Sequence, residues 1–248
     1  MSPGWDPEQY HRFSDERQRP FFDLLSLVEA VPGGTVADLG CGTGELTLFV
    51  HERTHAARTI GIDNSKEMLA EVPAAAGVEF RFGDLRYAPA CDVIFANASL
   101  QWVPDHPKVL HGWRHALDHG GQLAVQVPYN SDEPVYEVMN DTIASMGLDV
   151  PPDPVANVLA PGAYATLLHE LGFVRQLVRL QVYGQIMESI DGAIEWVKGT
   201  NLTRVRRSVP EATYEAFLDT YRARLRERLG DPRPYFYPFK RILFWGRL

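Results

Sequence analysis

Short apolar runs alternate with longer amphipathic stretches over the first half of the chain. The runs read TVADL (35–39), TIGID (59–63), VEFRF (78–82), CDVIFA (91–96) and GQLAVQV (121–127). The stretches between them carry apolar residues at helical spacing, over 45–53, 65–75 and 105–118. Strands that alternate with helices predict βαβ units, and therefore an α/β fold with a mainly parallel sheet and helices on both faces.

The pattern changes after Val127. Helical stretches are expected up to about Met146 and over 162–171. The segment FVRQLVRLQVYG (173–184) then alternates apolar and polar positions, as a strand with one solvated face does. A last strand is expected in FKRILFW (239–245).

Between these two strands lie roughly fifty residues of helical pattern, too many for a hairpin loop. They include the stretches 188–198 and 210–229. We therefore expect a helical lid over the carboxyl ends of the strands, where open α/β sheets bind ligands.

Size and composition favour a globular protein. The chain has 248 residues, 45% of them hydrophobic, which suffices for one elaborated domain or a domain plus a small lobe. It contains no apolar run of about 18 residues that could span a membrane. The first residues, MSPGWDPEQYHRFSDER, are too polar for a secretory signal. These features predict a cytoplasmic protein with no membrane association.

The net charge of −8 argues against a nucleic-acid-binding protein, which needs a basic face. The charge is unevenly distributed, since twelve Lys or Arg residues and five Asp or Glu residues follow from Lys198 onward. This part of the chain is therefore the expected place for an anionic ligand. The two cysteines, Cys41 and Cys91, and the eight histidines show no spacing typical of a disulfide framework or a metal site.

A glycine-rich turn follows the first apolar run, in VADLGCGTGELT (36–47). Its pattern is G-x-G-x-G, with Glu45 where a dinucleotide-binding turn has its third glycine. Asp38 precedes the turn and would repel a diphosphate, whereas it would attract a cation. S-adenosylmethionine fits this turn, because it carries an ammonium group, a sulfonium and an adenosine but no phosphate.

Acidic residues also end the next two strands. Asp63 follows at a distance where its carboxylate can accept hydrogen bonds from both ribose hydroxyls. Asp84, in GDLR, can accept from the adenine amino group, with the backbone N–H of Leu85 near a ring nitrogen. Three acids at three successive strand ends are more specific than the glycine pattern alone.

These residues resemble the class I S-adenosylmethionine-dependent methyltransferases. The resemblance implies a Rossmann-like seven-stranded sheet in which the last strand is inserted antiparallel. It also implies that the segment after the fourth strand, ANASLQWVPDH, faces the sulfonium. The expected cofactor-binding residues are Asp38, Gly40, Cys41, Gly42, Asp63, Asn64, Met68, Asp84, Leu85, Asn97, Ala98 and Ser99.

Two longer motifs, WDPEQYHRFSDERQRP (5–20) and FANASLQWVPDH (95–106), resemble the trans-aconitate 2-methyltransferase family. The stretches LAVQVP, IEWVKGTNL and YPFKRILF are similar to the same family, so the resemblance covers nearly the whole chain. Two positions depart from it. Gly184 stands where the family usually has His, and Asn201 where Gly is common, both in the region expected to shape the acceptor pocket.

The reaction implied by this resemblance is methylation of a carboxylate of a small polycarboxylic acid. A carboxylate is ionised at neutral pH, so it needs no general base, and no catalytic side chain and no metal are expected. The enzyme must orient the acceptor and bind its other carboxylates, a task suited to arginine. The expected substrate residues are Tyr10, Phe13, Arg17, Arg19, Trp102, Arg204, Arg206 and Arg207.

The expected organisation has four parts. Residues 1–30 form an N-terminal cap over the cofactor, 31–183 the cofactor-binding core, 184–235 the helical lid, and 236–248 the final strand. No obligate protein partner is evident.

Two other functions remain open at this stage. One is a carboxyl methyltransferase for another acid, such as a malonyl carrier-protein thioester, with Arg222, Arg224, Arg226 and Arg228 as a docking surface. The other is a catalytically silent module that binds S-adenosylmethionine.

Overall fold

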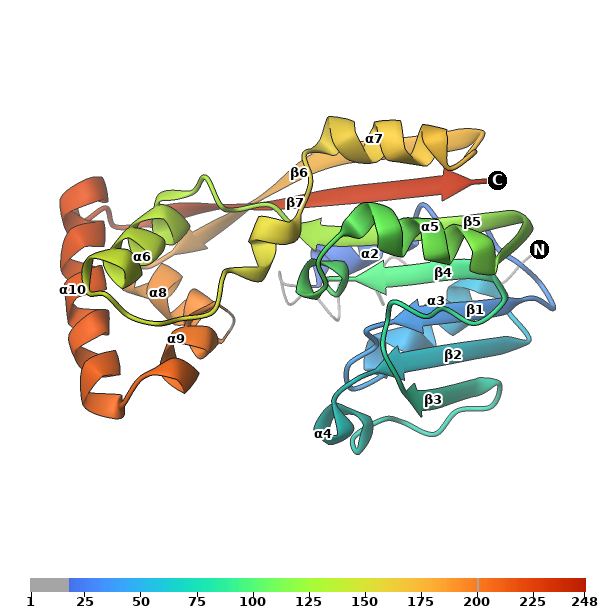
Figure 1. Ribbon diagram of the computed structural model, residues 1–248, viewed down its shortest axis with the longest axis horizontal. Helices are drawn as coiled ribbons and strands as arrows, with labels where there is room; N and C mark the ends of the chain where they lie inside the picture. The colour runs from blue at the N-terminus through green and yellow to red at the C-terminus, as the bar shows by residue number, and fades with distance from the viewer. Residues whose placement is uncertain (1–17, 200) are drawn as a thin grey trace. The chain divides into compact units, whose positions relative to one another are not determined.

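The computed structural model describes residues 18–199 and 201–248, which form two compact units (Figure 1). The first unit contains the chain up to Pro128, together with Asn157–Gln181 and Ile242–Leu248. The second contains Tyr129–Ala156 and Val182–Arg241. The chain therefore leaves the first unit twice and returns to it twice.

A seven-stranded sheet has the strand order β3-β2-β1-β4-β5-β7-β6. The strands are β1 (Thr35–Leu39), β2 (Arg58–Asp63), β3 (Val78–Phe82), β4 (Cys91–Asn97), β5 (Leu117–Pro128), β6 (Arg175–Met187) and β7 (Tyr235–Arg247). The pairs among β1 to β5 are parallel. Strand β7 lies between β5 and β6 and runs opposite to β4 in Figure 1, so the expected inserted antiparallel last strand is confirmed.

The helices follow the amphipathic stretches of the sequence. They are α2 (Arg19–Leu25), α3 (Glu45–Thr54), α4 (Lys66–Leu69), α5 (His106–Ala116), α6 (Pro134–Ser145), α7 (Pro161–Glu170), α8 (Ile190–Lys198), α9 (Leu202–Ser208) and α10 (Glu211–Leu229). Short 3₁₀ turns, η1 and η2, cover Leu100–Trp102 and Pro154–Asn157.

Helix α4 is much shorter than the stretch 65–75 predicted from the sequence. Ser65 caps its first turn by accepting a hydrogen bond from the backbone N–H of Met68. Pro73 follows closely and disfavours helical backbone at the residue before it, so the helix ends at Leu69. The predicted length was wrong because the stretch 65–75 includes Pro73, which cannot continue a helix.

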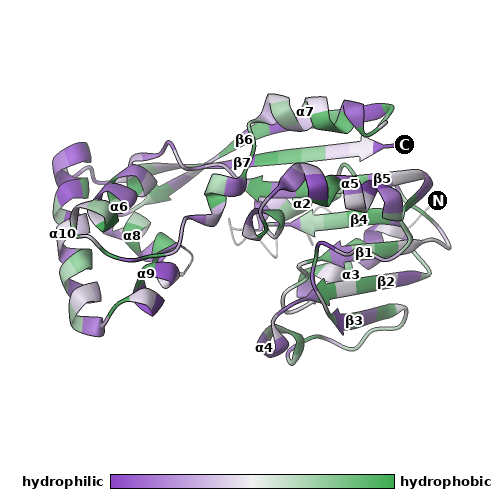
Figure 2. Cartoon of the chain, viewed as in Figure 1, coloured by the Kyte–Doolittle hydropathy of each residue, from purple (hydrophilic) through white to green (hydrophobic). Residues whose placement is uncertain are grey.

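The core of the first unit is built on α2 and the middle of the sheet. Phe21, Phe22, Leu24 and Leu25 of α2 are buried with residues of β1, β4, β5 and β7. The Phe21 ring meets Phe95 of β4 edge to face, at 5.5 Å between centroids. Figure 2 shows these central strands mostly in the colours of hydrophobic residues. Helix α2, which lies in the expected cap 1–30, thus packs into the core of the first unit; residues 1–17 of that cap lie outside the described residues.

The second unit has its own hydrophobic core, which joins α6, α8, α9 and α10 to the adjoining parts of β6 and β7. Its largest buried side chains include Tyr221, Tyr237 and Phe217. The expected lid, 184–235, lies within this unit. The unit also includes α6, which the sequence analysis assigned to the core domain.

Gln122 of β5 connects three segments of the first unit. Its side chain is buried, and its Oε1 accepts hydrogen bonds from the backbone N–H of Glu29 at 2.9 Å and from the indole N–H of Trp245 at 3.1 Å. Its Nε2 donates to the Glu29 carbonyl at 3.0 Å. One amide thereby joins the end of the α2 segment, β5 and β7.

We expect Gln122→Met to lower the free energy of unfolding by about 2–4 kcal/mol, because two buried donors and one carbonyl lose their partner. Urea denaturation measures the change. Gln176→Met, at an exposed position of β6, is the matched control and should change stability by less than about 0.5 kcal/mol. Equal stabilities for the two variants would contradict this role of Gln122.

Candidate functional site

The glycine turn joins β1 to α3 at the carboxyl edge of the sheet. Gly40 has φ 79°, and a Cβ built on it would lie 2.3 Å from the Cβ of Ser99. The Ser99 hydroxyl donates to the Leu39 carbonyl at 2.5 Å. Only glycine fits at position 40, because the backbone is left-handed and the segment after β4 approaches it so closely.

Asp38 is buried at the end of β1. Its Oδ2 accepts a hydrogen bond from the Thr47 hydroxyl of α3 at 2.6 Å. Burial raises the pKa of Asp38 from its ordinary value of 3.8 to about 6, against the opposing effect of Thr47. The site therefore holds a carboxylate that lacks a cationic partner among the described residues.

Asp63 ends β2 and lies against the same turn. Its Oδ2 accepts from the backbone N–H of Gly42 at 2.9 Å, and its Oδ1 from the backbone N–H of Ser65 at 2.8 Å. Each carboxylate oxygen retains a second lone pair for a further donor. Asp63 thus links the glycine turn to the start of α4.

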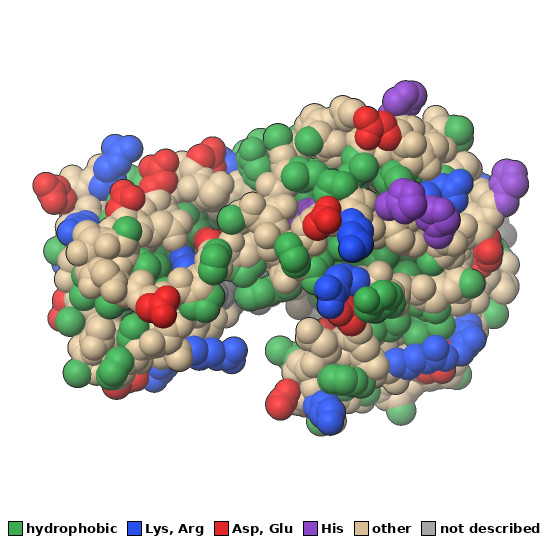
Figure 3. Space-filling model, viewed as in Figure 1, with side chains coloured by type: hydrophobic (Ala, Val, Ile, Leu, Met, Phe, Trp, Pro, Cys, Tyr) green, Lys and Arg blue, Asp and Glu red, His purple; other side chains and the backbone are tan. Residues whose placement is uncertain are grey.

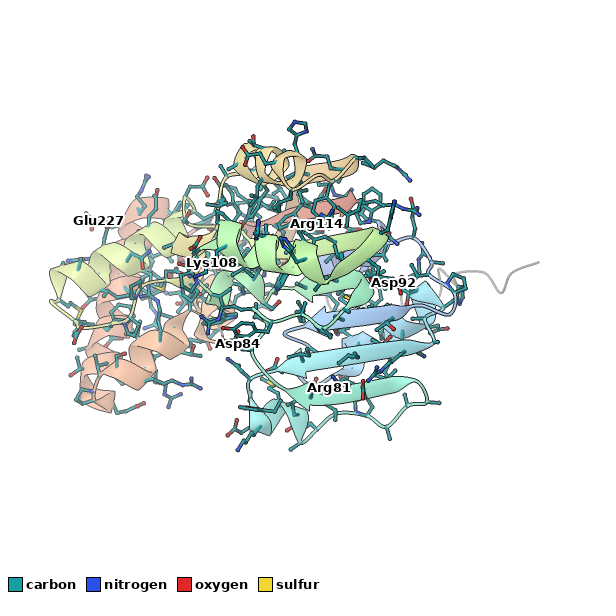
Figure 4. The ribbon with its side chains drawn as sticks, turned by 45° about the vertical axis from the view of Figure 1, so that its right-hand side comes forward. Arg81, Asp84, Asp92, Lys108, Arg114 and Glu227 are labelled. Carbon is teal, nitrogen blue, oxygen red and sulfur yellow. The ribbon has the colours of Figure 1, made fainter. Side chains whose placement is uncertain are left out.

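Asp84 lies on the loop after β3, labelled in Figure 4. Both of its oxygens accept hydrogen bonds from the Arg86 guanidinium, which holds the pKa of Asp84 below its usual range. The neighbouring Leu85 carbonyl accepts from the indole N–H of Trp113 at 2.8 Å. Trp113 is fully buried, which confirms that it is a core residue, and it fixes the loop that carries Leu85.

The segment after β4 contains unusual backbone and an unpaired acceptor. Ala98 has φ 52°, a left-handed conformation that is costly for a residue other than glycine. The Oδ1 of Asn97 is buried and has no hydrogen-bond partner within the described chain. His106 anchors the end of the segment: its Nε2 lies 3.0 Å from the Leu100 carbonyl and its Nδ1 lies 2.6 Å from the Tyr164 hydroxyl.

A pocket of about 560 Å³ opens at this edge of the sheet. Its lining residues are Gly40, Asp63, Asn64, Asp84, Leu85, Arg86, Ala98, Ser99, Trp102, Val103 and Pro104. Seven of the twelve expected cofactor residues are among them, and Trp102, expected at the substrate, lines the same pocket with 62% of its surface exposed. The structure thus brings together residues from four strand ends that are far apart in the sequence.

The other five expected cofactor residues do not line the pocket. Four are chain neighbours of lining residues or of the glycine turn, namely Asp38, Cys41, Gly42 and Asn97. Met68 lies on α4 and is exposed. Arg86 also lines the pocket and was not among the expected residues, whereas Val103 and Pro104 belong to the segment ANASLQWVPDH that was expected to face the sulfonium. The position of Arg86, two residues after Asp84 in GDLR, was a signal for the ion pair.

The expected substrate residues are spread more widely. Tyr10, Phe13 and Arg17 lie outside the described residues. Arg19 is exposed on α2, and Arg206 and Arg207 are exposed on α9. Arg204 is partly buried and donates to the Pro151 carbonyl at 2.7 Å and to Oδ1 of Asn140 at 2.6 Å. Its hydrogen bonds therefore serve the structure of the second unit.

The cysteines, the side chains that could bind a metal and the longer helices give no further candidate site within the described residues. Both cysteines are free thiols, and burial raises their pKa, that of Cys91 to about 12. Over residues 18–199 and 201–248, no three His, Cys, Asp or Glu side chains gather as a metal site would require. Of the helices in this part of the chain, none has the length and apolar character needed to cross a membrane.

Comparison with known proteins identifies the family. Residues 36–121 match the model of a methyltransferase domain. The chain is 38% identical to a trans-aconitate 2-methyltransferase of Deinococcus radiodurans, over 97% of this chain and 96% of that protein. The chain belongs to the trans-aconitate 2-methyltransferase family. A relative of the same name from Streptomyces avermitilis is 39% identical over 97% of this chain and 95% of its own length.

A solved structure supports the fold. The YcgJ protein of Bacillus subtilis superposes with a TM-score of 0.61 at 15% identity, over 93% of this chain and 98% of that one. As a member of the trans-aconitate 2-methyltransferase family, the protein is an S-adenosyl-L-methionine-dependent methyltransferase. The expectations for fold class, enzyme class and cofactor are therefore confirmed.

The chemistry of the pocket and of the residues next to it fits this cofactor. Asp38, two residues before Gly40, has a buried carboxylate, and Asn97, next to Ala98, has a buried acceptor that is unpaired within the described chain. Asp63 and Asp84 supply further acceptors for hydroxyl and amino donors. The cofactor carries cationic, hydroxyl and amino groups and no phosphate, so it can satisfy this set.

We expect Gly40→Ala to destabilise the protein by about 2–4 kcal/mol, because the new Cβ combines backbone strain with overlap on Ser99. It should also weaken cofactor binding, measured by calorimetry. Gly120→Ala is a matched control: its φ is 78° and nothing lies within 4 Å of its Cβ. It should cost only about 1 kcal/mol and leave cofactor affinity unchanged. Equal effects of both variants on cofactor affinity would refute the close approach at Gly40.

We expect the affinity for S-adenosylmethionine to fall as the pH drops below about 6, because Asp38 then takes up a proton and loses its charge. Affinities measured from pH 5 to 8 give the midpoint. Asp38→Asn should abolish the dependence. Thr47→Val, which removes the hydrogen bond that lowers the pKa of Asp38, should move the midpoint upward.

The same shift predicts the pH dependence of stability without ligand. A carboxyl with a raised pKa binds its proton more tightly in the folded chain than in the unfolded one. Asp38 therefore contributes stability below its ordinary pKa of 3.8, and this contribution is lost as the pH rises through about 6.

The Thr47→Val variant also tests the binding prediction. If the pH midpoint for cofactor binding is identical in the wild type and in Thr47→Val, Asp38 is not the titrating group.

Proposed function

We propose that the protein transfers the methyl group of S-adenosylmethionine to a carboxylate of trans-aconitate, giving a monomethyl ester. The observation that carries this proposal is the extent of the likeness. The methyltransferase-domain model covers only residues 36–121, whereas the trans-aconitate 2-methyltransferase relatives are similar over 97% of the chain. The likeness therefore includes the second unit, which the domain model does not reach.

The chain's own residues have three tasks in this reaction. Asp38, Gly40, Cys41, Gly42 and Asn97 to Ser99 hold the methionine part of the cofactor. Asp63 holds the ribose. Asn64, Met68, Asp84 and Leu85 hold the adenine. These assignments are supported by the pocket that Gly40, Asp63, Asp84 and Ser99 line together. The cofactor supplies an electrophilic methyl group on a sulfonium.

The acceptor needs orientation and no base. Its carboxylate is ionised at neutral pH, so the attacking oxygen already has its electron pair available. The new bond joins that oxygen to the methyl carbon as the carbon–sulfur bond breaks, and S-adenosylhomocysteine leaves. Proximity and alignment supply the rate enhancement. Cationic side chains bind the other carboxylates of the acid.

Among the arginines expected at the acid, Arg19, Arg206 and Arg207 are exposed and remain candidates, together with Arg17 outside the described residues. Arg206 also forms an ion pair with Glu211 at 3.4 Å, but such an exposed pair is weak. Tyr10, Phe13 and Trp102 would help to enclose cofactor and acceptor. A location in the cytoplasm also stays a prediction.

The alternative of a carrier-protein substrate has less support in the structure. Arg222 and Arg226 both donate to Asp191, at 3.0 and 2.8 Å, so part of the basic docking surface is already paired within the second unit. Figure 3 shows basic and acidic side chains interspersed on the visible face. A catalytically silent module that binds S-adenosylmethionine would keep the same acids; the likeness to trans-aconitate 2-methyltransferases over 97% of the chain favours an enzyme instead.

We expect trans-aconitate to be esterified far faster than cis-aconitate, citrate, isocitrate or a malonyl carrier protein when each is incubated with the protein and S-adenosylmethionine. Mass spectrometry of the methyl esters measures the rates. Replacing Arg17, Arg19, Arg204, Arg206 and Arg207 singly by Ala should raise KM at least tenfold at true contacts and leave kcat nearly unchanged. Preference for another acceptor would refute the substrate, and unchanged kinetics in all five variants would refute the arginine assignment.

A further inference from the structure

Most arginines of the second unit have a partner. Arg222 and Arg226 pair with Asp191, and Arg206 with Glu211. Arg204 donates to a carbonyl and to Asn140. Each of these guanidinium groups therefore has an ion-pair or hydrogen-bond partner within the unit, as is usual for arginines on a protein surface.

Arg241, in β7, is different. Its guanidinium forms no hydrogen bond or ion pair with any residue that the structure describes, and its Nε is buried without a partner. It lies over the ring of Phe239, with the guanidinium carbon 4.0 Å from the ring centroid. Burial lowers the pKa of Arg241 to about 10, so the group is still cationic at neutral pH.

Three tyrosine hydroxyls act on the charge of this cation. Tyr136, Tyr237 and Tyr183 oppose the lowering of its pKa. The Tyr237 hydroxyl donates to the Tyr136 hydroxyl at 3.2 Å, and both side chains are buried. Burial raises the pKa of Tyr136 and Tyr237, so both hydroxyls stay neutral. Because Tyr237 donates its proton to Tyr136, the Tyr136 proton is the one that can be donated to a further acceptor.

Asn130 adds an unpaired donor beside the same tyrosines. Its Oδ1 accepts from the backbone N–H of Lys240 at 2.6 Å, which fixes the side chain next to the peptide that leads into Arg241. Its Nδ2 has no partner at hydrogen-bond geometry within the described chain, although the residue is only 1% exposed. The same amide acts on the Tyr136 hydroxyl and opposes the rise of its pKa, so the two groups are neighbours.

The neighbouring carboxylates are engaged elsewhere. Glu133 and Asp132 pair with Lys240. Asp153 accepts from the backbone N–H of Val155 at 2.9 Å and from Nδ2 of Asn201 at 2.8 Å. Among the residues that the structure describes, this partly buried cation thus has hydroxyl and amide groups near it and no paired anion, an arrangement that an external anion would satisfy.

We propose that Arg241, together with the hydroxyl of Tyr136 and the amide of Asn130, binds a carboxylate of the acceptor acid. The planar guanidinium can donate two parallel hydrogen bonds to one carboxylate, and the neutral donors select an acceptor-only group. The inference rests on the proposed function for the identity of the acid. The carboxylate chemistry of the site rests on the second unit's own residues.

The test compares Arg241→Met and Arg241→Lys with Arg228→Met, which removes one positive charge from an exposed position of α10. Binding of trans-aconitate is measured by calorimetry in the presence of S-adenosylhomocysteine. We expect Arg241→Met to weaken binding roughly 30-fold or more. Arg241→Lys should retain part of the affinity, since lysine keeps the positive charge but lacks the planar guanidinium that can donate two parallel hydrogen bonds to one carboxylate. Arg228→Met should bind as the wild type does.

Two readouts separate binding of the acid from general damage. The affinity for S-adenosylhomocysteine should be unchanged in all three variants, and the KM for the acid should rise more than kcat falls. The neutral trimethyl ester of the acid should not bind to the wild type. A well-folded Arg241→Met variant that binds the acid within threefold of wild type would overturn the inference and leave the proposed function standing.

A second measurement uses the wild-type protein and is decisive if the Arg241 variants do not fold. Phenylglyoxal modifies accessible arginines, and mass spectrometry reports the rate at each one. The acid should slow modification of Arg241 and leave Arg228 unaffected, and its trimethyl ester should protect neither. Equal rates at Arg241 with and without the acid would overturn the inference.

Failure of the proposed function has a different signature. The wild type would then neither bind nor esterify trans-aconitate, and the same measurements would be made with citrate, cis-aconitate and a malonyl thioester. Protection of Arg241 by one of these carboxylates would support the site and would show that this compound, and not trans-aconitate, is the acid that binds there. Absence of protection by all of them overturns the site as well.

Discussion

The contact between the ends of β1 and β4 is the constraint on which the cofactor site depends. The Ser99 hydroxyl donates to the Leu39 carbonyl, and a Cβ built on Gly40 would lie 2.3 Å from the Cβ of Ser99. Because these parallel strands are neighbours in the sheet, their carboxyl ends open at one edge. A side chain at position 40 would separate the segments and open the floor of the pocket.

Around this contact, backbone groups and carboxylates hold one another in place. Asp63 accepts from the turn at Gly42 and from the start of α4, and Asp38 is tied to α3 through Thr47. The indole of Trp113, from the core, fixes the loop that carries Leu85. The acids are therefore positioned before any ligand binds, and the raised pKa of Asp38 reflects a burial cost that a cationic ligand would offset.

Each unit buries one charged group that has no opposite charge beside it among the described residues. In the first unit this group is the carboxylate of Asp38. In the second unit it is the guanidinium of Arg241. Burial shifts the pKa of both groups toward the neutral form, upward for Asp38 and downward for Arg241.

The sequence by itself determined the strand and helix order, the family and the acids at three strand ends, because each of these depends on local patterns of a few residues. Apolar residues at strand spacing and at helical spacing predicted nearly every element. The predicted length of α4 was wrong because the stretch included Pro73. Tertiary structure decided what depends on distant contacts. The clash that makes Gly40 obligatory involves Ser99, and Arg204 meets Pro151 and Asn140. Arg241 looked like one more basic residue, and only the folded second unit reveals that its charge has no partner in the described chain, since pairing depends on residues from α6, β6 and β7.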